Sequence, residues 1–107
     1  MGAHGLGLGT PAGTALRERI AAEALRSPVA RTRCAALRTL YGTPQETGCA
    51  LVRAALSDPA PEVREQALRL AAEGRFGEDW VQAALEAARA DPAPDVRRVA
   101  EALLARR

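Results

Sequence analysis

The chain has no lysine, one histidine, two cysteines and three aromatic residues. Few aromatic and β-branched side chains argue against a β-sandwich or a barrel. One histidine and two cysteines cannot form a zinc site of four protein ligands without carboxylates, and they leave little for acid–base catalysis. No apolar run approaches the roughly 18 residues of a membrane span, and no signal peptide is recognisable. We therefore expect a cytoplasmic protein with reduced thiols and with no metal or cofactor.

Alanine is abundant instead. It accounts for 25 of the 107 residues and lifts the apolar fraction to 48%. All 15 basic residues are arginine, and 13 acids leave a formal net charge of +2. Alanine has the highest helix propensity and its small side chain lets helices approach closely. The composition therefore favours closely packed helices over a solvated disordered chain.

A seven-residue motif occurs twice in the second half of the chain. Residues 58–64 read Asp-Pro-Ala-Pro-Glu-Val-Arg and return at 91–97, 33 residues later, with the single change of Glu62 to Asp95. A weaker copy lies at 27–33, 31 residues upstream of the first. A period of this length is typical of repeat proteins in which each unit is one helix pair. The chain therefore contains three repeats.

Each repeat predicts two helices. Thr14 is expected to cap the first helix, and Thr43 opens a capping box with Pro44 at the first helical position. Pro61 opens a later helix that ends at Gly74, because glycine is favoured just past a helix C-terminus. The expected helices cover residues 14–26, 28–41, 43–57, 61–74, 78–90 and 94–106.

The units divide the chain into a flexible glycine-rich segment, 1–13, and three repeats at about 14–42, 43–74 and 75–107. One helix pair cannot bury its apolar face alone, whereas three stacked pairs share one core. The sequence therefore predicts an all-α fold, a right-handed α-solenoid of six helices with a convex and a concave side.

The sequence resembles the HEAT repeat family, most closely its short bacterial, phycobiliprotein-lyase-type repeats. The residues that carry the resemblance are Asp58-Pro59, Val63-Arg64 and Ala67, with their copies in the third unit. The resemblance covers about residues 14–107. It implies a protein-binding scaffold. It does not carry over any catalytic residue.

The resemblance also implies a hydrogen-bonded ladder that joins successive repeats through Asp58, Arg64, Asp91 and Arg97. In the first unit Arg33 is kept, but Ser27 replaces the aspartate. We therefore expect the ladder to be incomplete at the first repeat.

The second helix of each HEAT-like unit usually lines the concave side, and this places five charged candidates on a partner-binding surface. Net charge is +4 over residues 14–42, −2 over 43–74 and 0 over 75–107. The positive first repeat favours an acidic partner. The candidate residues are Arg31, Arg38, Glu65, Arg69 and Arg98.

No nucleophile–base pair or cofactor motif is present, so we expect a protein that is not an enzyme. The favoured function is a small adaptor that binds a protein or peptide on its concave helices. One alternative is nucleic-acid binding, which the acidic central repeat disfavours; another is an accessory subunit of a lyase-type enzyme. Self-association through apolar end helices also stays open, with Leu16 and Ile20 at one end and Val99 and Leu103 at the other.

Several single residues admit two interpretations. Cys34 and Cys49 are interpreted as small buried apolar residues, although their helices are expected to be neighbours. Phe76 and Trp80 are interpreted as a core or inter-repeat plug, with a partner-binding anchor as the alternative. His4 lies in the glycine-rich segment and has no obvious partner.

Overall fold

The computed structural model describes residues 11–107, which form six α-helices and one 3₁₀ helix and contain no strand. The elements are α1 (Pro11–Ala24), α2 (Ala30–Arg38), η2 (Thr39–Gly42), α3 (Gln45–Ala55), α4 (Pro61–Ala72), α5 (Val81–Ala88) and α6 (Pro94–Ala105). The predicted glycine-rich segment falls largely on residues 1–10, and these, including His4, lie outside the described residues.

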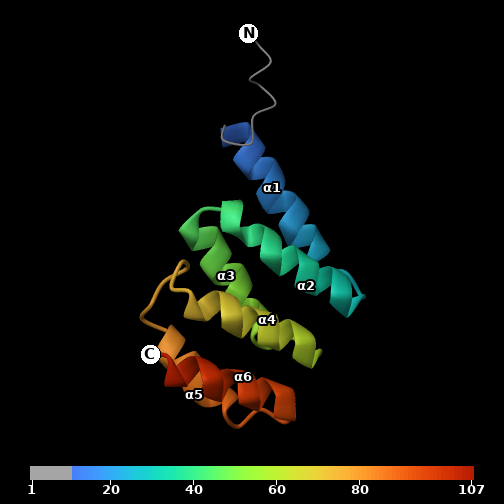
Figure 1. Ribbon diagram of the computed structural model, residues 1–107. Coiled ribbons are helices and arrows are strands. Elements are labelled where there is room, and N and C mark those ends of the chain that lie inside the picture. The colour runs from blue at the N-terminus through green and yellow to red at the C-terminus, as the bar shows by residue number, and fades with distance from the viewer. Residues whose placement is uncertain (1–10) are drawn as a thin grey trace.

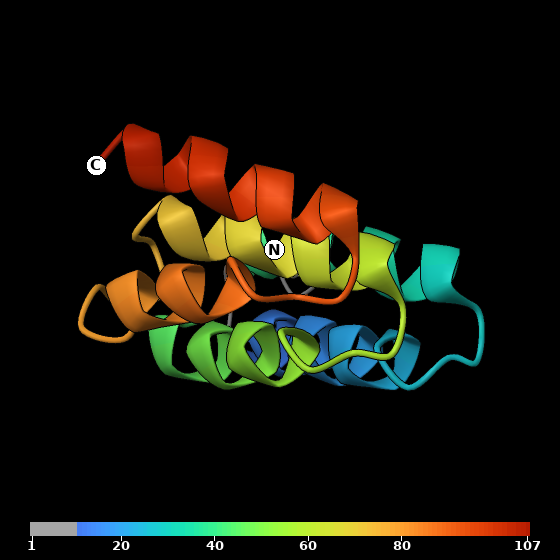
Figure 2. The same cartoon turned by 90° about the horizontal axis from the view of Figure 1, so that it is seen from below.

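The helices form three consecutive pairs, α1 with α2, α3 with α4, and α5 with α6 (Figure 1). The second helices α2, α4 and α6 lie side by side as one layer, and α1, α3 and α5 form the other (Figure 2). Contacts between repeats run mainly through the layer of second helices. This is the predicted all-α solenoid of stacked pairs.

The core is built from alanine and branched aliphatic side chains. Ala67, Ala71 and Ala100 are completely buried, which allows neighbouring helices to approach closely. Val99 and Leu103, which we expected to form an apolar stripe at the far end of the chain, are only 8% and 7% exposed and belong to this core. That expectation is therefore wrong for α6.

The exposed apolar side chains lie at the other end of the array. Leu16 and Ile20 on α1 are 46% and 59% exposed, as expected for that helix. Only α2 and η2 pack extensively against α1. The first repeat therefore leaves part of its apolar surface uncovered.

Helix starts differ from the sequence-based expectation at several places. α1 begins at Pro11, so Thr14 lies within the helix and does not cap it. α2 begins at Ala30, two residues after Pro28, because Val29 is extended with φ −94° and ψ 118°. In the repeat register Ala30 corresponds to Pro61 and Pro94, each of which stands at the start of its helix.

The predicted capping box at Thr43 is also wrong. Pro44 occupies the N-cap position of α3, and no side chain caps the helix. The Thr43 hydroxyl instead donates a hydrogen bond to the carbonyl oxygen of Leu40 at 2.7 Å. The Thr43 hydroxyl is therefore bonded to the preceding 3₁₀ turn and does not cap α3. The sequence pattern did not reveal this turn.

Two glycines occupy positions where the structure disfavours any other residue. Gly74 follows α4 with φ +77°, a left-handed conformation that favours glycine at a helix end, as predicted. Gly48 lies within α3, where an added Cβ would stand 2.2 Å from Cε1 of Phe76. Phe76 is 1% exposed and packs closely on the α3 backbone, so its interpretation as a core plug is confirmed.

Candidate partner-binding surface

Two arginine–aspartate pairs join the repeats. Arg33 on α2 donates from Nε to Oδ2 of Asp58 at 2.8 Å and from Nη2 to Oδ1 at 2.9 Å. Arg64 on α4 holds Asp91 in the same way, with both distances 2.8 Å. The four side chains are only 11–14% exposed. Each arginine thus binds the aspartate that precedes the second helix of the following repeat.

This direction overturns the expectation that the ladder lacks an acid at the first repeat. Arg33 needs no aspartate in its own unit, because Asp58 of the next unit supplies one. The Nη1 group of Arg33 donates to the backbone carbonyl of Ser27 at 2.7 Å, and a serine provides that carbonyl as well as an aspartate does. The replacement at Ser27 therefore leaves the first pair intact.

Hydrogen bonding sets the ionisation of the two aspartates. Burial by itself raises the pKa of Asp58, but hydrogen bonds from Arg33 and from the Ala60 N–H outweigh it and lower the pKa. The hydrogen bond from Arg64 is the largest influence on Asp91 and lowers its pKa against the opposing effect of burial. The same bonds raise the pKa of both arginines. Both carboxylates therefore stay ionised well into the acid range.

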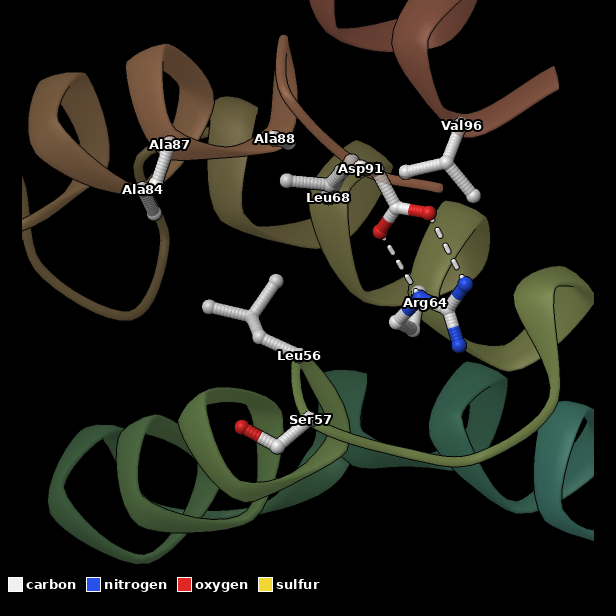
Figure 3. A pocket seen from close by; sticks show the side chains of 9 residues that line it. All are labelled: Leu56, Ser57, Arg64, Leu68, Ala84, Ala87, Ala88, Asp91 and Val96. Atoms are coloured by element: carbon white, nitrogen blue, oxygen red, sulfur yellow. Dashed lines mark hydrogen bonds and ion pairs between the residues drawn. The ribbon is translucent and has the colours of Figure 1, made fainter. Parts of the chain in front are cut away.

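The Arg64–Asp91 pair forms one wall of a cavity of about 250 Å³ between the second and third repeats (Figure 3). Small side chains of α5 and its C-terminal end leave this space unfilled. The lining residues are Leu56, Ser57, Arg64, Leu68, Ala84, Ala87, Ala88, Asp91 and Val96. Because both charged groups are already paired with each other, the cavity presents an apolar rather than a charged interior.

A larger and more open groove of about 640 Å³ lies between α4 and α6, and we refer to it as the α4–α6 groove. Three arginines and three acids line it, so its charge is balanced. Arg98 and Asp95 form an exposed ion pair within α6. The lining residues are Glu65, Arg69, Asp95, Arg98, Val99, Glu101, Ala102, Leu103 and Arg106.

A second hollow of about 350 Å³ continues this surface toward the ends of the same two helices. It shares Arg69, Leu103 and Arg106 with the α4–α6 groove. Arg107, which also lines this hollow, donates hydrogen bonds to Gln82 on α5 and to Glu78 before that helix, both at 3.0 Å. The two hollows form one surface that follows the line between α4 and α6.

Three of the five predicted partner-binding residues meet in this groove: Glu65, Arg69 and Arg98. The other two, Arg31 and Arg38, are exposed on α2 and do not line it. Sequence reasoning missed Asp95, Glu101 and Arg106 as groove residues. All three belong to α6 or its C-cap, but only the stack shows that this helix adjoins α4.

The aromatic and cysteine candidates lie outside the α4–α6 groove, with Cys34 on α2, Cys49 on α3, and Phe76 and Trp80 between α4 and α5. Trp80 is partly buried, and its Nε1 donates a hydrogen bond to the carbonyl oxygen of Phe76 at 3.3 Å. The Arg53 guanidinium carbon lies over the Trp80 ring, 5.3 Å from the ring centroid. Cys34 and Cys49 are free thiols, each partly buried against the core rather than fully enclosed. Burial raises the pKa of Cys34. These observations fit structural roles.

Over residues 11–107, no helix is long and apolar enough to cross a membrane, and no cluster of three potential metal ligands occurs. A family model described as HEAT repeats matches residues 18–105, which is most of the chain. The chain belongs to the HEAT repeat family. Neither the comparison with curated proteins nor that with solved structures found a match. HEAT repeats are generally protein-interaction modules, and the family in general is a non-catalytic scaffold.

Proposed function

We propose that this HEAT-repeat chain is a small non-catalytic adaptor that binds a peptide segment of a partner protein in the α4–α6 groove. The observation that supports the proposal is the groove itself, in which charged side chains of two neighbouring helices surround a nearly buried aliphatic floor, Val99 and Leu103. An apolar floor with a polar rim is the usual composition of a protein–protein contact. The groove follows the line between two helices, a shape suited to an elongated ligand.

The balance of charge in the groove specifies the partner. Arg69 and Arg106 can bind carboxylates, whereas Glu65 and Glu101 favour basic groups nearby. A segment that carries both signs of charge therefore fits this groove better than a uniformly acidic one. An acidic partner remains suited to the first repeat, where Arg31 and Arg38 are exposed on α2.

The same balance disfavours nucleic-acid binding. Binding to a phosphate backbone needs several cationic contacts without interleaved acids, and its strength falls steeply with salt. We expect no salt-sensitive binding of duplex DNA, which fluorescence anisotropy at low ionic strength measures directly. Binding that weakens sharply between low and moderate salt would replace the adaptor proposal with the nucleic-acid alternative.

Site-specific photo-crosslinking in native cells tests the groove. A photo-reactive amino acid is placed at Ala102, which is exposed in the groove, and separately at Ala83, which is exposed on α5 in the other layer. We expect a discrete crosslinked protein from position 102 only. The crosslink should disappear in a variant with both Arg69→Glu and Arg106→Glu, and persist with Arg31→Glu and Arg38→Glu, which change the charge equally outside the groove.

Equal crosslinking from both positions would contradict a groove-specific partner. So would a crosslink at position 102 that survives reversal of both groove arginines. Circular dichroism of each variant confirms that the helices remain folded, which the exposure of all four arginines leads us to expect.

A further inference from the structure

Three arginines occupy equivalent positions in the three repeats. Arg33, Arg64 and Arg97 each donate from Nη1 to a backbone carbonyl six residues upstream, at 2.7 Å in every case. The carbonyls belong to Ser27, Asp58 and Asp91, which are residues of the same repeat as the arginine. Each guanidinium is therefore oriented by its own repeat, independently of the next unit in the stack.

The first two arginines use their remaining donors on an aspartate of the next repeat. Nε and Nη2 bind the two carboxylate oxygens of Asp58 or Asp91 at 2.8–2.9 Å. Among residues 11–107, no carboxylate is bound to the corresponding two donors of Arg97, which is oriented in the same way. We propose that Arg97 is a preformed receptor for an aspartate carboxylate of a separate polypeptide.

The two filled copies of the site define the ligand. Asp58 and Asp91 each precede a proline, and in each the Oδ1 atom accepts the N–H of the residue two positions on, Ala60 or Ala93, at 2.8 Å. A helix begins at the next residue in both cases. The carboxylate is thus held in a tight turn that aims both oxygens at the arginine. The expected ligand is an Asp-Pro turn at the start of a helix.

A second copy of this chain is a poor source of that turn. The corresponding position of its first repeat is Ser27, which offers no carboxylate. The residue one helical turn after each arginine also argues against a second copy of the chain. Leu37 and Leu68 are 0% and 1% exposed, but the third repeat has Glu101 at this position, and it is exposed.

Glu101 also disfavours the stacking of a further repeat of the same kind on the third repeat. Leu68 shares its cavity with Ala84, Ala88 and Val96 of the third repeat. Equivalent small apolar side chains placed over Glu101 would bury an unpaired carboxylate, which is costly. The partner must therefore supply an aspartate to Arg97 and a polar or basic group to Glu101. Glu101 lines the α4–α6 groove but Arg97 does not, so a test that follows the Arg97 guanidinium distinguishes this site from the proposed function.

Nuclear magnetic resonance on the full chain tests the receptor. The probe is the capped peptide acetyl-Asp-Pro-Ala-Pro-amide, and its matched control has asparagine in place of aspartate. We expect the Nε–Hε resonance of Arg97 to shift saturably with the aspartate peptide only, while those of Arg33 and Arg64 stay fixed because their donors are occupied.

Two substitutions sharpen the result. Arg97→Lys keeps the charge but loses the forked donor pair, and we expect the dissociation constant, followed through backbone amides of α6, to rise about tenfold. Arg19→Lys, at an exposed position of α1, should leave it unchanged. Glu101→Gln removes a neighbouring negative charge and should tighten binding of this anionic probe about twofold to fivefold at low salt.

An Arg97 resonance that does not move, or that moves equally with the asparagine peptide, would overturn the proposal. A shift that depends on protein concentration without peptide would overturn it as well, because the occupant would then be a second copy. The asparagine control decides the question on the unaltered chain even if Arg97→Lys perturbs the fold.

Discussion

At the scale of single residues, the contact between Gly48 and Phe76 shows how far tertiary structure can override helix propensity. Glycine within a helix is normally less favourable than alanine by about 1 kcal/mol. Here an alanine Cβ would stand 2.2 Å from the Phe76 ring. We predict that Gly48→Ala lowers the free energy of unfolding by about 1 to 3 kcal/mol, as overpacked cores do. Urea denaturation measures the change.

The matched control places Gly48→Ala in a chain that also carries Phe76→Leu. If the ring is the cause, the alanine should cost much less there, since a smaller side chain leaves room for the Cβ. A cost that is the same in both backgrounds would show that the helix itself, and not Phe76, requires the glycine.

The aspartates of the ladder predict how stability depends on pH. Hydrogen bonds lower the pKa of Asp58 and Asp91 in the folded chain. The stabilisation they provide is therefore fully present above the unfolded value of about 3.9 and is lost as the pH falls through the folded values. We expect urea midpoints to fall steeply below about pH 4.

A chain with both Asp58→Asn and Asp91→Asn should be less stable at pH 7 but should lose less on acidification, because two of the linked protons have been removed. The exposed Asp95 offers a control, and Asp95→Asn should leave the pH profile almost unchanged. An identical acid slope in the double variant and the wild type would assign acid sensitivity to other carboxylates.

At the scale of the helices, the first residue of α2 differs from its two counterparts. α4 and α6 begin with proline, whereas α2 begins with Ala30. Val29 before it has φ −94° and ψ 118°, close to the values of Ala60 and Ala93 before the two prolines. This extended conformation is the one that a following proline requires.

We therefore predict that Ala30→Pro stabilises the chain by about 0.4 to 1 kcal/mol, chiefly by restricting the unfolded state. Thermal unfolding followed by circular dichroism measures the effect. Ala35→Pro is the control, because Ala35 is exposed in the interior of the same helix and proline there should cost about 3 kcal/mol or more. A destabilising Ala30→Pro would mean that α2 needs its alanine for contact with the core.

The helices also show which features the sequence could predict. The repeat motif predicted the positions of α4 and α6 closely, because Pro61, Pro94 and Gly74 act on the backbone locally. The sequence pattern gave a wrong prediction where a side chain typical of a helix cap forms a different hydrogen bond in the fold. Thr43 resembles a helix cap, but its hydroxyl bonds to Leu40.

α5 is another boundary that the pattern misplaced. The expected start near Glu78 is helical in composition, yet α5 begins at Val81. Gly77 has φ +110°, and residues 78–80 after it form a turn in which the Val81 N–H donates to the carbonyl oxygen of Glu78 at 3.2 Å. The α4–α6 groove lay further beyond prediction, since it joins side chains of two repeats and depends on how closely α4 and α6 approach.

At the scale of the whole molecule, α4 is central and α1 is peripheral. α4 packs against α2, α3, α5 and α6, whereas α1 packs mainly against α2 and η2 and leaves Leu16 and Ile20 exposed. In a stack of repeats, stability is roughly the sum of each unit and its neighbours, so a terminal helix opens first. We predict faster amide hydrogen exchange in α1 than in α4.

Mass spectrometry after native-state exchange measures this difference. Replacing Leu16 and Ile20 by glutamine should change α1 protection little, because both side chains already face solvent. Protection of α1 that rises with protein concentration would instead indicate self-association through this helix, and sedimentation of the same samples would then report a dimer.

The two faces at the extremes of the stack are chemically unlike: one shows bare aliphatic groups, the other a guanidinium and a carboxylate. The stack of repeats is therefore polar, with two different ends. In the described part of the chain, aliphatic side chains at one end would meet charged side chains at the other if two copies stacked end to end, which is a poor match. A ligand suited to one end is therefore unsuited to the other, and the two ends do not compete for the same ligand.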